Sequence, residues 1–275
     1  MKLLFLDQYG EMGGAQRCFL DLAPILLESG WEIRALLPQR GDFAEALRQA
    51  GVEVTGIDIG PFGQGRKSAG DVMRYVRQKR PLREIVKQAL AEKPAVMLVN
   101  GPRVLQAAAS IRDTPPIVFH CHHFLESRFL RAVVRRWLRY SGAAAVCPSR
   151  FLADQLEGET HIIPNACPDL GFTPGTRTTE GLTVGLIGRI MPQKGQAVLV
   201  EAVRRIRSRI TGLRAVICGD TRFHDMDAAR YDESLRHEAV GLPVRFLGWQ
   251  KNPASVLRSL DLLVVPSTVA EGSPR

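Results

Sequence analysis

The 275-residue sequence contains no long apolar run and no leader pattern. A membrane-spanning helix needs about 20 consecutive apolar residues, and every apolar run here is much shorter. The amino terminus, MKLLFLDQYG, reaches the charged Asp7 too soon for a secretory signal peptide. Any contact with a membrane is therefore expected to be peripheral.

Paired cysteines are missing as well. The five cysteines are scattered, odd in number and never arranged as CxxC. This pattern argues against a disulfide framework and favours reduced thiols. We therefore predict a cytoplasmic protein, with the inner face of the cell membrane as the place of any peripheral contact.

Several common catalytic motifs are also absent. The sequence has no GxSxG and no HExxH, so common hydrolase and zinc-enzyme functions lack support. The segment GPFGQGRKS comes close to a P-loop, but Arg66 takes the place of the lysine and Lys67 that of the serine or threonine. We reject a P-loop on that ground. The first turn, GEMGG, lacks the GxGxxG spacing of a dinucleotide fingerprint.

Acidic residues are fewer than basic ones. The chain has 37 Lys and Arg against 28 Asp and Glu, which gives a formal charge of +9. Such a balance suits phosphorylated ligands, anionic lipid headgroups or nucleic acid, and does not choose among them.

Short apolar runs alternate with helical patterns along the whole chain. The pattern predicts seven strands from KLLFLD to the region before Asn165, and four more from LTVGLIG to DLLVVPS. Alternating strands and helices form parallel sheets. A stretch rich in Gly, Pro and Thr at 166–181 separates the two halves. We predict an α/β protein with two Rossmann-like domains, 1–168 and 169–275, the second incomplete because such domains usually have five or six strands.

Two glycines, Gly13 and Gly14, open the helix that follows the first strand. Glycine lets the backbone approach a ligand, and a helix amino terminus offers N–H groups to an anion. A plain strand-to-helix turn explains the same residues, and both interpretations stay open.

The segment VFHCHHF carries histidines at the end of a predicted strand. The period of two places His120 and His122 on one face. His122 lies nearer the carboxyl end, where ligand crevices form in open α/β sheets, so we choose it as the site candidate and place His120 in the core. A metal site is the alternative, but no nearby thiolate or carboxylate has zinc-ligand spacing.

Two cations flank a turn in GLIGRIMPQKGQAVLVEAV. Arg189 follows a strand and a glycine, and Lys194 precedes Gly195, which opens a helix. Two cations and a helix amino terminus favour a diphosphate site. Solvated loop charges are the less specific alternative.

The end of the chain, LDLLVVPSTVAEGSPR, places Glu271 and Gly272 in a loop after a strand. A carboxylate in this position can accept hydrogen bonds from sugar hydroxyls, although a single loop glutamate is more often simply solvated.

Arginines recur every three or four residues in FLESRFLRAVVRRWLRYSG. We expect them on one helix face, opposite an apolar face, which is a pattern of helices on anionic membranes. A solvated face over a buried one explains it equally well. The arginines are Arg128, Arg131, Arg135 and Arg139.

In order and spacing, these segments resemble the GT-B-type retaining glycosyltransferases of the glycosyl transferases group 1 family. GGAQR is similar to the family's Gly-Gly motif beside the donor phosphates, and HCHH to its strand ending in a site histidine, which falls on His122. GLIGRIMPQKGQ is similar to its phosphate-binding segment, and the final strand and loop to its donor-sugar segment.

The resemblance implies transfer of a sugar from a UDP-, GDP- or ADP-sugar to an acceptor hydroxyl with retention, without cofactor or metal. Arg189 and Lys194, with Gly13 and Gly14, would bind the donor diphosphate. Glu271 and Gly272 would bind the donor sugar, and His122 and Glu271 would be the catalytic residues. The implied role is bacterial cell-surface or lipid-linked glycan synthesis on a glycan or lipid-linked acceptor, with no nucleic-acid partner.

The family's E-x₇-E motif would need a second glutamate four residues beyond Arg275. By resemblance that carboxylate holds the donor ribose, which implies a C-terminal truncation and leaves the activity of these 275 residues open. Two alternatives also stay open: a nucleotide-sugar epimerase or hydrolase of the same fold, and an inactive truncated module that binds an anionic partner.

Overall fold

The computed structural model describes residues 1–60, 69–125, 127–167, 181–221, 226–250, 252–269 and 271–272. The near-P-loop segment and most of the predicted domain boundary therefore lie outside the described residues. The chain divides into two compact units, Met1–Pro168 with Glu271–Arg275, and Asp169–Ala270. Each unit contains its own parallel sheet.

The first unit has a seven-stranded sheet in the order β3-β2-β1-β4-β5-β6-β7, and all of its described strand pairs are parallel. Successive strands run outward in one direction from β1 and in the other from β4, so the order reverses between these two central strands. In open α/β sheets the ligand crevice lies at this reversal, outside the carboxyl ends. The strands are β1 (Lys2–Asp7), β2 (Glu32–Leu37), β3 (Glu53–Gly56), β4 (Val96–Asn100), β5 (Ile117–His120), β6 (Ala144–Cys147) and β7 (Thr160–Ile162).

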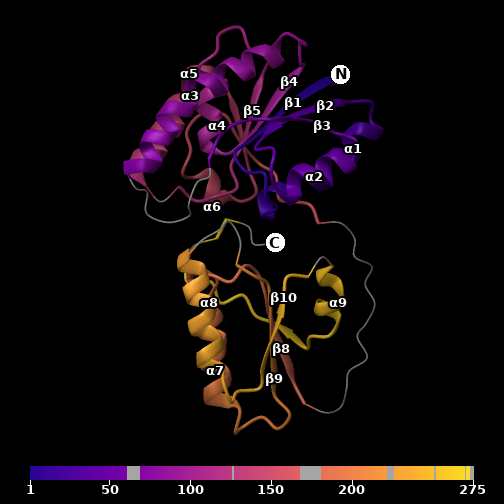
Figure 1. Ribbon diagram of the computed structural model, residues 1–275, viewed down its shortest axis with the longest axis vertical. Coiled ribbons are helices and arrows are strands. Elements are labelled where there is room, and N and C mark those ends of the chain that lie inside the picture. Colours follow the sequence, from indigo (N-terminus) through magenta and orange to yellow (C-terminus); the bar gives the residue numbers. More distant parts are fainter. Residues whose placement is uncertain are drawn as a thin grey trace. The chain divides into compact units, whose positions relative to one another are not determined.

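Helices cover both faces of this sheet (Figure 1). Side chains of α1 and α2 join one core, where the Phe5 and Phe19 rings stack with centroids 3.5 Å apart. Side chains of α3, α4 and α5 join the other core, with Leu4 and Leu6 on the opposite face of β1. The alternation of β1 residues between two cores explains its unbroken apolar sequence. The helices are α1 (Gly14–Glu28), α2 (Asp42–Gln49), α3 (Ala69–Leu90), α4 (Pro102–Ala109), α5 (Arg128–Ser141) and α6 (Arg150–Ala153).

The second unit has a four-stranded parallel sheet in the order β10-β9-β8-β11. The order reverses between β8 and β11, with α7 and α8 on one face and α9 on the other (Figure 1). The strands are β8 (Thr183–Ile187), β9 (Arg214–Cys218), β10 (Val244–Gly248) and β11 (Leu262–Leu263), and the helices are α7 (Gln196–Ile206), α8 (Met226–Glu238), α9 (Pro253–Arg258) and the 3₁₀ turn η1 (Pro192–Lys194). The predicted α/β fold with two parallel sheets is confirmed.

Candidate functional site

Polar side chains meet at the reversal point of the first sheet. Asp7 ends β1 beside Asn100 of β4, and Asn100 lies beside His120 of β5. A cavity opens next to these strand ends. Its lining includes Gln8, Tyr9, Gln16, Asn100, Gly101, His120 and His122. The structure thus brings the predicted His122 to the edge of the sheet where α/β proteins bind ligands.

The Gly-Gly turn leaves open space above the start of α1. Gly13 is the N-cap, without a side-chain cap or an acidic residue in the first turn among the described residues. A Cβ atom added to Gly14 would meet no atom within 4 Å. The turn can therefore receive a ligand, and the amino terminus of α1 is suited to an anion.

Gly10, in the same segment, has a different role. A Cβ there would lie 2.0 Å from the Arg40 backbone oxygen, and one on Gly41, at φ +127°, would lie 2.2 Å from the Gly10 oxygen. The two loops approach so closely that neither position admits a side chain. GEMGG therefore contains one packing glycine and, at Gly14, one glycine that faces open space.

Asp7 is a site residue that the sequence did not reveal. Its side chain is fully buried and accepts hydrogen bonds from the Tyr9 backbone N–H and from the amides of Gln16 and Asn100. Burial raises the pKa of Asp7 to about 7, although these hydrogen bonds act in the opposite direction. A perturbed acid in a crevice is typical of functional sites. The available signal was an acidic residue at the end of an otherwise apolar strand.

The two histidines of HCHH have different surroundings. The His120 and His122 rings lie side by side, with centroids 3.7 Å apart, as the period of two predicts. Burial lowers the pKa of His120 to about 4, so its ring is neutral at neutral pH. His122 is half-buried and lines the cavity. Within the described ranges, no group of three or more His, Cys, Asp or Glu residues could hold a metal ion.

The second unit places Arg189 and Lys194 in one loop at the carboxyl end of β8. Both side chains are half-buried. The turn ends at Gly195, whose φ is +72° and whose added Cβ would lie 2.0 Å from the Pro266 oxygen. The Thr268 backbone N–H also donates to the Gln193 oxygen over 2.9 Å. Contacts with the loop after β11 therefore hold the turn in shape.

Two further residues that sequence reasoning missed support this turn. Gln196 is fully buried, and its Nε2 donates to the Arg189 backbone oxygen over 2.7 Å. The Ala197 backbone N–H donates to the Tyr231 hydroxyl over 3.1 Å, so one of the N–H groups in the first turn of α7 already has a partner. The helix dipole still favours an anion beside Arg189 and Lys194.

Glu271 and Gly272 group with the first unit rather than with the second. Both are half-buried. A Cβ on Gly272 would lie 2.2 Å from Cδ1 of Leu152, so this glycine has a packing role beside α6. Gly13, Gly14 and His122 belong to the first unit as well, and Arg189 and Lys194 to the second.

The arginine row of α5 is not a uniformly solvated face. Arg135 pairs with Glu157 over 2.7 Å and donates to the Gln155 backbone oxygen. Arg131 stacks over the Phe124 ring. The outward face instead combines cations with aromatic side chains, of which Phe129 is 79% and Tyr140 60% exposed. The exposed cations of this helix are Arg128, Arg136 and Arg139. No helix in the described part of the chain has the length and apolar character to cross a membrane.

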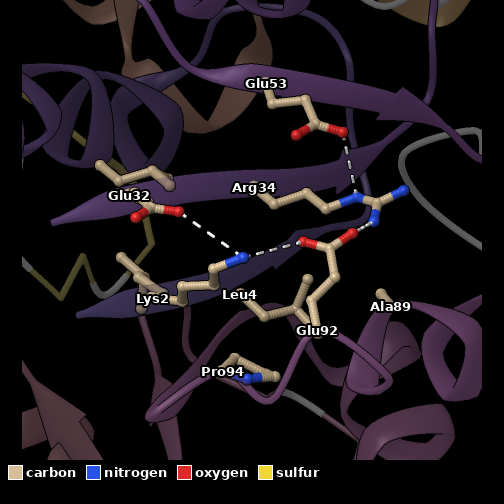
Figure 2. A pocket seen from close by; sticks show the side chains of 10 residues that line it. Lys2, Leu4, Glu32, Arg34, Glu53, Ala89, Glu92 and Pro94 are labelled. Atoms are coloured by element: carbon tan, nitrogen blue, oxygen red, sulfur yellow. Dashed lines mark hydrogen bonds and ion pairs between the residues drawn. The ribbon is translucent and has the colours of Figure 1, made fainter.

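A second cavity lies at the opposite, amino-terminal edge of the first sheet (Figure 2). Arg34 pairs there with Glu53 over 3.4 Å and with Glu92, and Lys2 pairs with Glu32 and Glu92 over 3.6 and 3.9 Å (Figure 2). Although this cavity is the larger of the two, its charged groups pair with one another and it lies away from the carboxyl ends. We assign it to stability.

Two family models match the chain. A glycosyl transferase 4-like domain covers residues 13–166, and a glycosyl transferases group 1 domain covers residues 181–275. No curated protein sequence matches significantly.

Solved structures share the fold. Anabaena HepE, in complex with UDP and glucose, is 23% identical with a TM-score of 0.75, over 98% of this chain and 75% of that one. Sucrose-phosphate synthase from Thermosynechococcus elongatus is 14% identical with a TM-score of 0.76, over 100% and 77%. The lipopolysaccharide outer core galactosyltransferase WaaB is 15% identical with a TM-score of 0.66, over 100% and 76%. With the two family models, this similarity shows that the chain belongs to the glycosyltransferases of the GT-B fold, with a glycosyl transferase 4-like domain followed by a group 1 domain.

Proposed function

We propose that the protein transfers a sugar from a nucleoside diphosphate sugar to an acceptor hydroxyl, with retention at the anomeric carbon. The turn from Gly188 to Gly195 carries the proposal, because it places two cations and a helix amino terminus at the reversal point of the second sheet. This combination suits a diphosphate. HepE, which shares the fold, was crystallised with UDP and with UDP-glucose, so UDP is the first donor nucleotide to test, ahead of GDP and ADP.

The chemistry follows from charge development on the donor. The bond between the anomeric carbon and the diphosphate oxygen breaks, and the acceptor oxygen forms the new bond. Negative charge gathers on the leaving diphosphate, where Arg189, Lys194 and the start of α7 would stabilise it. The acceptor proton passes to the leaving phosphate oxygen. These cations would take the charge-stabilising role without a metal.

The other predicted residues receive roles in the same proposal. Gly13 and Gly14 would let the backbone approach donor phosphates. His122, beside the cavity, would hydrogen-bond sugar or acceptor, and Glu271 with Gly272 would contact the donor sugar.

We propose that the acceptor is a glycan or a lipid-linked molecule in bacterial cell-surface glycan synthesis. The outward face of α5, with Phe129 and Tyr140 among exposed arginines, suits an anionic membrane surface, since aromatic rings and cations both favour the headgroup region. The corresponding location is the cytoplasmic face of the cell membrane.

Thermal shift with nucleotides tests the donor site. UDP at about 100 times its Kd should raise the stability of the second unit by about 2.7 kcal/mol. The variant R189A/K194A should lose this shift. Arg205 and Arg209 are exposed cations of the same unit, and the matched variant R205A/R209A should keep it. Equal binding of UDP, GDP and ADP by R189A/K194A and the wild type would reject the donor site.

Product analysis tests the reaction. Incubation with UDP-glucose and an acceptor panel should give a glycoside with the donor's anomeric configuration by NMR. Product formed equally without any acceptor would indicate a hydrolase or an epimerase instead.

A further inference from the structure

A buried acid that the proposed reaction does not use lies behind Gln16 and Asn100, which line the cavity at the carboxyl edge of the first sheet. Asp7 accepts from the Tyr9 backbone N–H at 2.9 Å and from Gln16 Nε2 at 3.0 Å to each carboxylate oxygen. Asn100 Nδ2 donates to Oδ2 at 2.5 Å. These contacts all come from neutral N–H donors, so among the residues that the structure describes no cation compensates the carboxylate.

The carboxylate dictates how two amide side chains are turned. An ionised carboxylate only accepts hydrogen bonds, so it selects the nitrogen end of each amide. The oxygen of a planar amide lies on the other side of the group from its nitrogen. The carbonyl oxygens of Gln16 and Asn100 are therefore turned away from Asp7. Both side chains line the cavity.

On the basis of the function proposed above, we propose that Asp7 is a positioning residue. It holds the Asn100 and Gln16 amides so that their oxygens accept a hydrogen bond from a hydroxyl group of the acceptor in this cavity. The size of the cavity agrees with this ligand, because the space that a water molecule can occupy is about 20 Å³, enough for one water or hydroxyl. We assign this contact to a hydroxyl that anchors the acceptor, because the hydroxyl that attacks the donor must give its proton to the leaving phosphate oxygen.

Protonation of Asp7 would reverse this arrangement. Oδ1 accepts from the Tyr9 backbone N–H, which cannot turn over, so the proton from solvent goes to Oδ2, which faces Asn100. The Asn100 amide must then rotate by half a turn to accept from the new O–H group. Its NH₂ group would take the former place of its oxygen, and the cavity would lose an acceptor for the hydroxyl.

The groups around Asp7 indicate when this change occurs. The pKa of Asp7 is raised to about 7 by burial, and no charged side chain in the described part of the chain contributes to that shift. On the neighbouring elements, β5 contributes His120, with a pKa of about 4. His122 and His123, which follow β5, also line the cavity. The loop after β1 contributes Tyr9, whose hydroxyl oxygen accepts a hydrogen bond from Arg103 of α4. β2 ends in the apolar Leu37, and α1 contributes Gln16.

NMR of the full chain tests the proposal without an acceptor of known identity. The side-chain NH₂ signals of Gln16 and Asn100 should titrate together, with a midpoint near the Asp7 pKa of about 7. D-glucose, used as the hydroxyl probe, should bind about fivefold more weakly one pH unit below this midpoint than one unit above it, because one acceptor is lost.

Two variants test whether Asp7 is the group that titrates. Asp7→Asn should abolish the titration and make glucose binding independent of pH. Asp154→Asn, an exposed acid after α6, should leave both unchanged. The NMR titration of the wild type needs no variant, so the proposal can be tested even if Asp7→Asn does not fold.

Other results would overturn the proposal. Amide signals that do not move in the wild type, or that move equally in Asp7→Asn, would reject Asp7 as the positioning residue. Glucose affinity that is the same on both sides of the midpoint would reject the hydroxyl site. UDP binding is measured in parallel. Its absence would count against the proposed function, whereas a failed amide titration with UDP binding intact would count against the role of Asp7 alone.

Discussion

The two edges of the first sheet handle charge in opposite ways. At the amino-terminal edge, Lys2 and Arg34 meet glutamates in ion pairs whose side chains are 26% to 74% exposed. At the carboxyl edge, Asp7 is fully buried, and its hydrogen-bond donors in the described part of the chain are all neutral. Exposed pairs keep most of their hydration, so they contribute little and cost little. A buried acid gives up its hydration, which is why its pKa rises.

This difference separates a stabilising cluster from a functional one. The edge with more charges and the larger cavity is the one where each charge has an opposite partner (Figure 2). The edge with one buried acid lies at the reversal of strand order, where ligands bind. A perturbed acid at that position indicates function more strongly than the number of charges does.

The largest expected effect is on the pH dependence of the free energy of unfolding, and it tests how much the burial of Asp7 destabilises the folded protein. The pKa of Asp7 rises from an ordinary 3.8 to about 7 in the folded protein. The folded state therefore binds more protons between these values, and the resulting stability is fully present below pH 3.8 and is lost as the pH rises through about 7. Asp7→Asn cannot titrate, so its stability relative to the wild type should rise by about 2 to 3 kcal/mol from about pH 5 to about pH 8.

Urea unfolding of both proteins across this range measures the effect. The difference between the two proteins is needed, because His120 has a lowered pKa and contributes stability that is lost as the pH falls. The two slopes oppose each other in the wild type, whereas His120 is common to both proteins. If the difference in the free energy of unfolding between the two proteins stays constant with pH, Asp7 behaves like an exposed acid. The two edges of the sheet would then not differ in the way described above.

The sequence predicted the strands and sheets of the molecule better than the residues of its candidate site. The run KLLFLD matches β1 residue for residue, because the middle of a strand buried on both faces is apolar. The sequence could indicate His122 and the turn with Arg189 and Lys194 as candidates, because each comes at or after the end of a predicted strand. Gln16 and Asn100 could not be predicted, because they become partners of Asp7 only when α1 and β4 pack beside β1. The packing roles of Gly10 and Gly272 likewise depend on loops distant in sequence.

Arg34→Ala should have a smaller effect. The Arg34 side chain is 26% exposed, pairs with Glu53 and Glu92, and donates to the Thr55 hydroxyl. Its loss should destabilise the first unit by about 1 kcal/mol, less at high salt. Arg48→Ala, which removes a pair with Glu45 on α2, is the matched control and should have almost no effect. A loss that salt does not reduce would mean that packing of the Arg34 stem, rather than charge, stabilises this edge.

The smallest effect is expected for Lys2→Ala. Lys2 is 43% exposed and reaches Glu32 and Glu92 only at 3.6 and 3.9 Å, so its removal should lower stability by less than about 0.5 kcal/mol. The double variant with Arg34→Ala is more informative, because both cations share Glu92. Either cation can partly neutralise Glu92 alone, so the double variant should lose more than the sum of the single losses. Strict additivity in urea unfolding would show that the cluster is a set of independent pairs, and the contrast with the coupled groups around Asp7 would become sharper.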